Sequence, residues 1–186
     1  MSYTDLLVYR LAVTIQDGSA LFCEKFLTDP RYRRTVEQMD QANRSCKQNI
    51  VEGVSEKSYE SQLKLIGVSR ASYNELLEDF KDYLRLRKLA LWDKNDLRVL
   101  KIRAYRESVG KETNLANLSN WSNLNLASDE NFANIMICLI HKESYLVDQL
   151  SRAIEKKFVE QGGFRESLLK KRMEYKRQDT NKTKQS

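Results

Sequence analysis

Histidine and cysteine are the residues of this chain best suited to bind metals or to act as bases and nucleophiles. The chain has one histidine, His141, and three cysteines, Cys23, Cys46 and Cys138. A zinc site needs about four such ligands at close spacing, and a catalytic base needs a nucleophile and an orienting partner. The cysteines are widely spaced and lie at or near apolar positions of helical patterns, which favours buried free thiols in a reducing compartment. We therefore predict no catalytic residue, no metal site and no cofactor, and a chain that is not an enzyme.

Two clusters of basic residues have the chemistry to bind anions instead. One lies in a predicted helix over 93–108 and comprises Lys94, Arg98, Lys101, Arg103 and Arg106. The first three recur at helical spacing together with Tyr105, so they are predicted to share one helix face. The other lies in the C-terminal tail around Tyr175 and comprises Lys170, Lys171, Arg172, Lys176 and Arg177. Such clusters bind phosphates and release counterions, and an aromatic ring beside them can stack on a base. We predict these residues as contacts for RNA or DNA, with a solvated charged face as the alternative.

The distribution of charge sets the C-terminal tail apart from the rest of the chain. The 186 residues have a net charge of +6 at pH 7. From Gly162 onward there are eight basic and three acidic side chains, so the remainder of the chain is nearly neutral. A neutral body with a basic tail favours an anionic partner, although the same charge also keeps a protein soluble.

Long helices are predicted to position these residues. The chain has one proline and six glycines, and so few breakers argue against a sheet protein with many turns. Amphipathic periodicity extends over 3–28, 33–53, 58–91 and 129–161. Four such helices bury their apolar sides most simply in an all-α fold, an antiparallel up-and-down four-helix bundle. The sequence leaves open whether the short helix 93–108 or the helix 129–161 is the fourth member.

The predicted organisation has four parts. Residues 1–110 form a helical-bundle domain and 111–128 an Asn-rich connecting segment. Residues 129–161 form a long helix that packs on or completes the bundle, and 162–186 form a basic tail with a disordered end.

Local signals predict where the helices end and which sides face inward. Ser55 or Ser58, and later Ser128, are predicted caps, and Gly53 is predicted in the left-handed position just past a helix end. In the first helix the predicted inward stripe comprises Leu6, Tyr9, Val13, Ala20, Cys23 and Leu27. In the second helix it comprises Val36, Met39, Asn43, Cys46 and Ile50, and in the short helix Leu97, Leu100 and Ala104.

The N-terminal segment does not have the pattern of a secretion signal. Asp5, Arg10 and Asp17 interrupt its apolar stretch, and no small-residue cleavage site follows. The longest purely apolar run, 135–140, is far short of the roughly 20 residues of a membrane helix. The sequence therefore predicts a cytoplasmic protein with no membrane partner.

The run QANRSCKQNIVEG, residues 41–53, resembles the signature of the four-helix-bundle proteins named after the 23S rRNA intervening sequence. Its last five residues, Asn49–Gly53, match that signature well. Two further stretches, 70–92 and 139–166, look like a longer subgroup that carries a C-terminal four-helix-bundle suffix domain. The resemblance covers most of residues 33–172.

This resemblance implies a small helical bundle. Some members of the family form pentameric rings, which implies a homo-oligomer with a pentamer as one form. A related accessory protein works with the reverse transcriptase of diversity-generating retroelements and is thought to bind nucleic acid through a basic surface. Together with the basic clusters, this predicts a non-enzymatic accessory protein that binds RNA or DNA electrostatically. The alternative is a protein–protein interaction scaffold with no nucleic-acid role.

Overall fold

The structure, a computed structural model, describes residues 3–104 and 128–183, with side chains as far as Arg177. Within these ranges all regular secondary structure is helical, which confirms the predicted all-α bundle class. The helices are η1 (Tyr3–Asp5), α1 (Leu7–Phe26), η2 (Pro30–Tyr32), α2 (Arg33–Ser55), α3 (Tyr59–Leu86), α4 (Leu97–Ala104), α6 (Asp129–Gln161) and α7 (Phe164–Thr183). The predicted Asn-rich segment lies outside the described residues as far as position 127.

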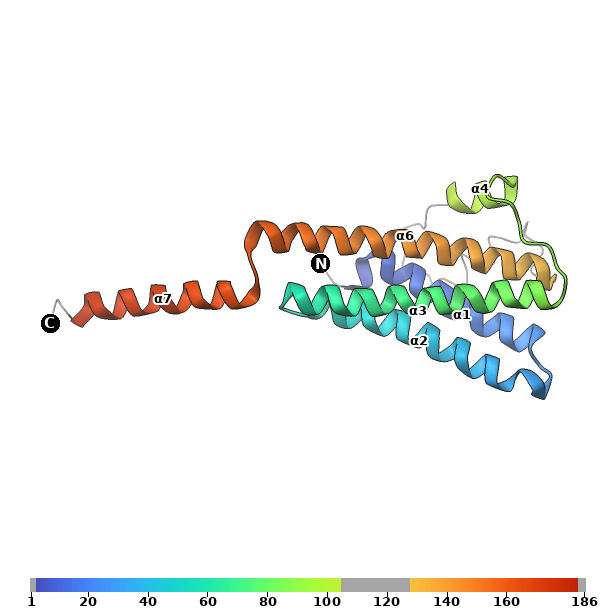
Figure 1. Ribbon diagram of the computed structural model, residues 1–186, viewed down its shortest axis with the longest axis horizontal. Helices are drawn as coiled ribbons and strands as arrows, with labels where there is room; N and C mark the ends of the chain where they lie inside the picture. Colours follow the sequence, from blue (N-terminus) through green and yellow to red (C-terminus); the bar gives the residue numbers. More distant parts are fainter. Residues whose placement is uncertain (1–2, 105–127, 184–186) are drawn as a thin grey trace.

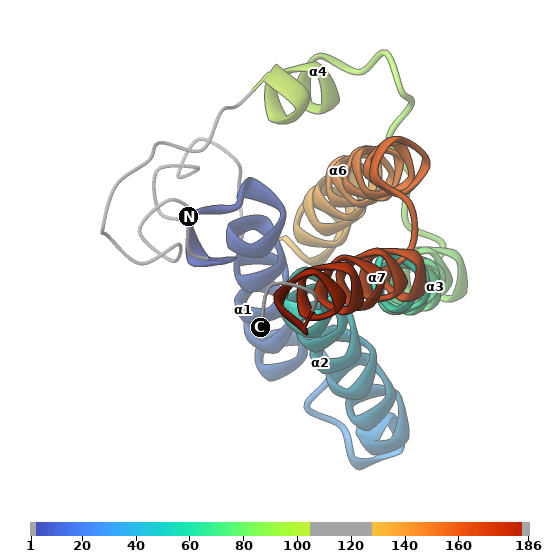
Figure 2. The same ribbon diagram turned by 90° about the vertical axis from the view of Figure 1, so that its left-hand side faces the viewer.

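Four helices surround one core. Helices α2 and α6 each pack against both α1 and α3, so the four form a closed ring (Figure 1, Figure 2). The turn between α1 and α2 lies at one end of this bundle, and the turn between α2 and α3 lies at the other (Figure 1). The fourth member of the bundle is therefore α6, and α4 packs on the outside of α6 (Figure 2).

Two predicted serine caps and one glycine define the helix ends. The Ser58 hydroxyl accepts the backbone N–H of Ser61 at 3.4 Å, and the Ser128 hydroxyl accepts that of Asn131 at 3.4 Å. These bonds satisfy N–H groups that the first turn of a helix leaves without a partner. At the other end of α6, Gly162 has a positive φ of 77° and donates its N–H to the Phe158 carbonyl at 2.9 Å. Glycine adopts that conformation at little cost, so α6 ends here and the chain turns into α7.

The inward stripe predicted for the first helix is only partly right, since Leu27 lies in the core and Leu6 and Cys23 pack against it. Helix α1 buries Val8, Leu11, Ile15 and Phe22, whereas the predicted Ala20 is exposed. The other predicted residues are partly buried except for Leu27, which is fully buried. The Phe22 ring lies in an aromatic cluster, with its centre 5.1 Å from that of Phe80 and 5.6 Å from that of Phe132. Large rings gain most from burial, and they set the rotation of the helix.

Helix α2 shows the predicted stripe but a different role for its glycine. Met39, Asn43, Cys46 and Ile50 are buried, as predicted. Gly53 does not follow the helix: it is a buried residue inside α2, which continues to Ser55. A Cβ atom at Gly53 would lie 3.0 Å from the Cδ1 of Ile66 on α3. The glycine therefore permits a close approach of α2 and α3 and is not needed for a left-handed turn.

Helix α4 is rotated relative to the prediction. Leu97 and Leu100 are 73% and 44% exposed and Ala104 is exposed, whereas Val99 and Ile102 are buried. Both apolar pairs are three residues apart, so the periodicity alone permits either orientation. In α6, every residue of the run 132–140 is buried, because α4 covers a side that the other three bundle helices leave open.

Helix α7 extends away from the end of the bundle (Figure 1, Figure 2). It continues to Thr183, so much of the tail predicted over 162–186, including part of its C-terminal end, is helical. From Arg165 to Arg177 every side chain is exposed except Ser167, which is partly buried. Helix α4 lies over the half of α6 that is farther from α7 (Figure 1).

Candidate nucleic-acid interface

The C-terminal basic cluster lies entirely on α7. All five of its predicted members are exposed, namely Lys170, Lys171, Arg172, Lys176 and Arg177. With about 3.6 residues per turn, these positions project to several sides of the helix, so α7 is basic around its circumference. Four large apolar side chains lie among the cations and are 49–70% exposed: Leu168, Leu169, Met173 and Tyr175.

The structure divides the other predicted cluster. Helix α4 begins only at Leu97, so Lys94 lies in the turn before the helix. The prediction that Lys94 shares one helix face with Arg98 and Lys101 is therefore wrong. The Asp96 carboxylate accepts the backbone N–H of Arg98 at 2.8 Å. Local bonds of this kind compete with the helical hydrogen-bond pattern and favour a helix start at this point.

Two further described residues of this cluster, Arg98 and Lys101, have different surroundings. The Arg98 guanidinium is 2.7 Å from the Asp96 carboxylate, and its Cζ is 3.9 Å from the centre of the Trp92 ring. The hydrogen bond from Arg98 lowers the pKa of Asp96 to about 2, so the charge of Arg98 is balanced within the protein. Lys101 is exposed on α4, and Arg106 lies outside the described residues.

Lys94 and Arg103 meet residues from two other helices. A cleft of about 110 Å³ lies between α3, α4 and α6, and we name it the basic cleft. Its polar lining comprises Lys81, Trp92, Lys94, Arg103, Asn134 and His141. The Arg103 Nη1 donates to the Lys94 backbone carbonyl at 3.4 Å, which links α4 to the turn before it.

Asn134 positions the chain segment that forms one wall of the basic cleft. Its Oδ1 accepts the backbone N–H of Trp92 at 2.8 Å, and its Nδ2 donates to the Ala90 carbonyl at 2.8 Å. Just after α3, Lys88 has a φ of 57°, which reverses the direction of the chain. These local features hold Trp92 against α6 and bring the following Lys94 to the cleft.

The charges around the basic cleft have little internal compensation. The Lys81 Nζ is 2.8 Å from the Glu78 carboxylate, whereas Lys94 and Arg103 form no ion pair with any described residue. Burial lowers the pKa of His141, and the positive charges of Lys81 and Arg103 lower it further. Cations that disfavour protonation of a neighbouring imidazole create a positive potential, which attracts anions.

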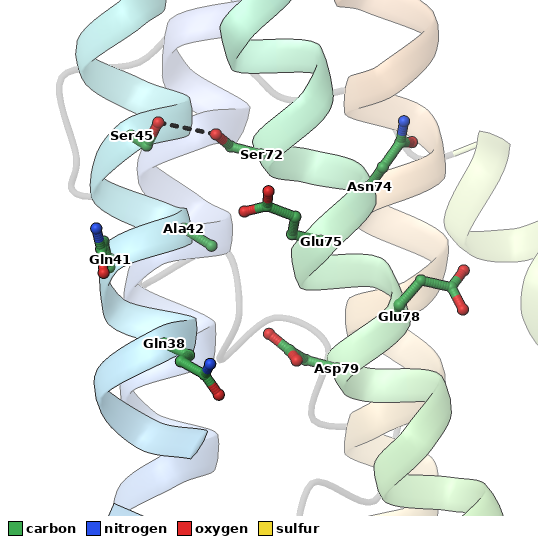
Figure 3. Close-up of a pocket in the computed structure, with 9 residues that line it drawn as sticks. All are labelled: Gln38, Gln41, Ala42, Ser45, Ser72, Asn74, Glu75, Glu78 and Asp79. Atoms are coloured by element: carbon green, nitrogen blue, oxygen red, sulfur yellow. Dashed lines mark hydrogen bonds between the residues drawn. The ribbon is translucent and has the colours of Figure 1, made fainter. Parts of the chain in front are cut away.

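A groove on another side of α3 has the opposite charge. It lies between α2 and α3, has a volume of about 840 Å³, and is named the acidic groove (Figure 3). Its lining comprises Gln38, Gln41, Ala42, Ser45, Ser72, Asn74, Glu75, Glu78 and Asp79. Burial raises the pKa of Asp79 to about 6, and the neighbouring Asp82 and Glu75 contribute. All of its carboxylates come from α3 (Figure 3), and their charge repels nucleic acid.

Sequence reasoning identified two residues of the basic cleft and missed two others. Lys94 and Arg103 were predicted from local charge, but Lys81 and His141 were not. Lys81 lies among acidic residues of α3, and His141 is an isolated histidine on α6. Their proximity to Lys94 arises because α4 folds back over α6, and no local pattern in the sequence indicates that contact.

Other chemistry has little support in the described part of the chain. There, no three His, Cys, Asp or Glu side chains are close enough together to hold a metal ion. The cysteines are free thiols: Cys46 and Cys138 are buried, and Cys23 is partly buried. Burial raises the pKa of both Cys23 and Cys138 to about 11, and a neutral thiol is a poor nucleophile. None of the described helices has an apolar stretch that could cross a membrane.

The fold and these surfaces define an all-α helical-bundle protein with two exposed basic regions, α7 and the neighbourhood of α4. No family model, no curated protein and no solved structure matches the chain. The resemblance to the intervening-sequence bundle family stays a prediction.

Proposed function

We propose that this chain is a non-enzymatic accessory protein that binds RNA or DNA electrostatically and acts as a homo-oligomer. The observation that carries the proposal is α7, a 20-residue helix on which all five predicted cations are exposed. Around α4, Lys94, Lys101 and Arg103 add a second region. Arg98 contributes less, because Asp96 already balances its charge.

A basic helix suits binding that ignores base sequence. Between Phe164 and Arg177 there are six basic side chains and two acidic ones. Each phosphate that a cation neutralises releases counterions, so affinity falls steeply with salt. The logarithm of the binding constant falls with the logarithm of the salt concentration, with a slope of roughly −0.7 to −0.9 per phosphate contact. Tyr175 is 70% exposed among these cations and offers a ring on which an unpaired base can stack.

Fluorescence anisotropy of a labelled RNA and a DNA of the same sequence tests this proposal. The α7 variant replaces five cations with Gln, at Lys170, Lys171, Arg172, Lys176 and Arg177. The control variant has the same change in charge, with Gln at five exposed positions elsewhere: Lys25, Arg34, Arg44, Lys57 and Lys64. Glutamine has nearly the same helix propensity as lysine and arginine, so neither variant should lose helical structure.

We expect wild-type affinity to fall about a hundredfold between about 50 and 200 mM salt. The α7 variant should bind at least about tenfold more weakly at the lower salt and lose most of the salt dependence, whereas the control should keep it. Absence of binding at low salt contradicts the proposal, and an equal loss in both variants contradicts the role of α7.

Oligomerisation has a separate test. Several copies of α7 on one particle would raise the apparent affinity for a long strand, because later contacts are intramolecular. Light scattering of the full chain at micromolar concentration should give a mass of more than one subunit. A monomer at that concentration contradicts this part of the proposal.

A protein-interaction scaffold is the second candidate, and the exposed apolar residues of α7 favour it. Leu168, Leu169 and Met173 are 49–61% exposed among the cations. A protein partner held by these side chains would bind in a salt-tolerant way, unlike nucleic acid. Replacement of Leu169 and Met173 with Ser should then abolish binding of that partner while nucleic-acid affinity stays within about twofold.

A further inference from the structure

The basic cleft differs in shape from α7. From Arg165 to Arg177 helix α7 is exposed except at Ser167, whereas the cleft is a small cavity bounded by α3, α4 and α6. Its volume of about 110 Å³ is room for several waters, since a cavity needs roughly 10–15 Å³ to hold one. Such a space takes one phosphate group and leaves little room for a whole nucleotide.

The ionisable lining of the cleft suits an anion. Lys81, Lys94, Arg103 and His141 come from α3, from the turn before α4, from α4 and from α6, so the fold brings together residues far apart in the chain. No carboxylate lines the cleft in the described part of the protein. Carboxylates of neighbouring residues already have partners: Glu78 pairs with Lys81, Asp96 pairs with Arg98, Asp93 accepts the N–H of Asn95, and Glu130 accepts that of Ala90.

The indole of Trp92 supplies an independent observation. Trp92 lines the cleft and is 8% exposed, and its Nε1–H has no hydrogen-bond partner among the described residues. A buried donor without an acceptor is uncommon and costs stability. A phosphate oxygen in the cleft would supply the missing acceptor.

We propose that the basic cleft binds the terminal phosphate of a nucleic acid strand. This inference rests on the proposed function and assigns one step of it, the capture of a strand end, to Lys94, Arg103, Lys81 and the Trp92 N–H. Helix α7 then contacts the internal phosphates of the same strand.

A terminal phosphate fits the cleft better than an internal one does, for reasons of charge and size. A phosphate monoester carries about −1.5 to −2 at pH 7, and Lys94 and Arg103 are the two cations of the cleft that no described residue pairs. An internal phosphodiester has a single charge and enters only together with the sugars on both sides. The small volume of the cleft excludes those sugars.

Tyr145 is an exposed aromatic residue near the cleft, where the first nucleotide of a bound strand would reach it. It follows His141 by one turn on α6, so their Cβ atoms are about 5–6 Å apart. The Tyr145 side chain is 63% exposed, and its ring is free to stack on the terminal base. Tyr145 therefore distinguishes a nucleic acid end from a free phosphate ion, which has no base.

The test is competition against an internally labelled single strand that carries hydroxyls at both ends. The competitors have one sequence and carry a 5′-phosphate, a 3′-phosphate or hydroxyls alone, with inorganic phosphate and a 5′-mononucleotide as further arms. The cleft variant is Lys94→Ala with Arg103→Ala. The matched control, Lys57→Ala with Lys64→Ala, removes the same charge from exposed positions outside the cleft and outside both proposed basic regions.

We expect at least one of the two end-phosphorylated strands to compete about tenfold better than the hydroxyl strand. The cleft variant should abolish this ratio, even if it also weakens the hydroxyl strand, because Lys94 and Arg103 belong to the second basic region as well. The control and the α7 variant should keep the ratio. Tyr145→Ala should weaken the phosphorylated strand and leave inorganic phosphate unchanged.

The two proposals fail in different ways in this experiment. A ratio near one in the wild type overturns the terminal-phosphate site and leaves binding through α7 intact. The same ratio in the cleft variant as in the wild type also overturns it. If the hydroxyl strand does not bind at all, the proposed function fails instead. Competition by inorganic phosphate or the mononucleotide as strong as that of the phosphorylated strand, at equal concentration, overturns the assignment to a strand end.

Discussion

Helix α3 lies between two surfaces of opposite charge, the acidic groove and the basic cleft. The acidic groove takes its carboxylates from α3, and burial beside Asp82 and Glu75 raises the pKa of Asp79. The basic cleft takes Lys81 from the same helix, and burial beside Lys81 and Arg103 lowers the pKa of His141. On both surfaces the neighbours disfavour the charged form of a titratable group.

The two surfaces differ in size and in how their polar groups are satisfied. The acidic groove is wide, about 840 Å³, and its Ser45 and Ser72 hydroxyls bond to each other at 2.8 Å (Figure 3). The basic cleft is about an eighth of that volume, and the N–H of Trp92 in its lining lacks an acceptor in the described structure. Like charges in a broad trough are screened by water and salt. Like charges around a small cavity with an unused donor favour a bound counter-charge, so of these two surfaces the basic cleft is the one proposed to bind an anion.

The largest expected effect is a loss of folding stability when a buried residue of α3, the helix that both surfaces share, is truncated. Phe80 is fully buried on α3, and its ring packs against Phe22. Phe80→Ala should lower the free energy of unfolding by about 3–5 kcal/mol, because it removes buried contacts and leaves a cavity. Urea denaturation followed by circular dichroism measures this change. Leu86→Ala, at a position that is 71% exposed on the same helix, should change stability by less than about 0.5 kcal/mol. Equal losses of unfolding free energy in the two variants would contradict the role of Phe80 in packing α3 against the core.

Much of the scaffold was predictable, because helix periodicity and caps are local properties. Ser58 and Ser128 mark the starts of α3 and α6, and Gly162 marks the end of α6. Rotation about the helix axis was harder to predict. Both α1 and α4 have two apolar stripes, and only the helices that pack against them decide which stripe is buried.

The candidate site was predictable only in part, for a similar reason. Charge density along the sequence identified the cations of α7, because their exposure on a single helix does not depend on contacts with distant segments. The basic cleft depends on contacts between distant segments: Asn134 bonds to the backbone of Trp92, and Lys81 and His141 approach only when α3, α4 and α6 are packed. The Asp96 turn that removes Lys94 from α4 was visible in the sequence, because aspartate favours such positions.

The next effect concerns the acidic groove and depends on pH. The pKa of Asp79 is raised from 3.8 to about 6, mainly by burial, so the folded state holds a proton between these values that the unfolded state releases. Stability from this group is therefore greatest below about pH 4 and is lost as pH rises to about 6. Asp79→Asn should raise the free energy of unfolding at pH 7 by about 1 kcal/mol, a figure reduced for solvent screening.

Chemical denaturation of both proteins at pH 4.5 and pH 7 measures this difference. The stability of the Asp79→Asn variant relative to the wild type should grow with pH across that interval. Glu37→Gln, an exposed carboxylate on α2, is the control and should show no such growth. A constant difference between Asp79→Asn and the wild type contradicts the electrostatic cause.

A smaller effect lies at the boundary between the two surfaces. Glu78 lines the acidic groove, yet its carboxylate pairs with Lys81 of the basic cleft at 2.8 Å. Glu78→Gln releases Lys81 and should tighten binding of an end-phosphorylated strand by about twofold to fivefold, the range expected for an exposed ion pair. Glu75→Gln makes the same change in charge without contacting Lys81. Equal tightening by the two variants would show that net charge, and not the pairing of Lys81, sets the affinity.

The smallest expected effect is a change in the pKa of His141, which reports directly on the basic cleft. His141 is the only histidine of the chain, so it gives a single set of imidazole resonances in NMR. Burial and the cations Lys81, Arg103 and Arg70 hold the pKa of His141 below 6.5 in the free protein. Since the unfolded state takes up this proton more readily, the contribution of His141 to folding stability is present above pH 6.5 and is lost as pH falls below it.

An anion in the cleft favours the imidazolium, so sulfate, which keeps its charge over this range, should raise the pKa of His141. In the variant with Lys94→Ala and Arg103→Ala, the pKa of His141 should start higher, because one of its neighbouring cations is gone, and should respond less to sulfate. The contrary result is a pKa of His141 that sulfate leaves unchanged in the wild type at concentrations that compete with an end-phosphorylated strand. That result would place the anion outside the basic cleft and contradict anion binding there.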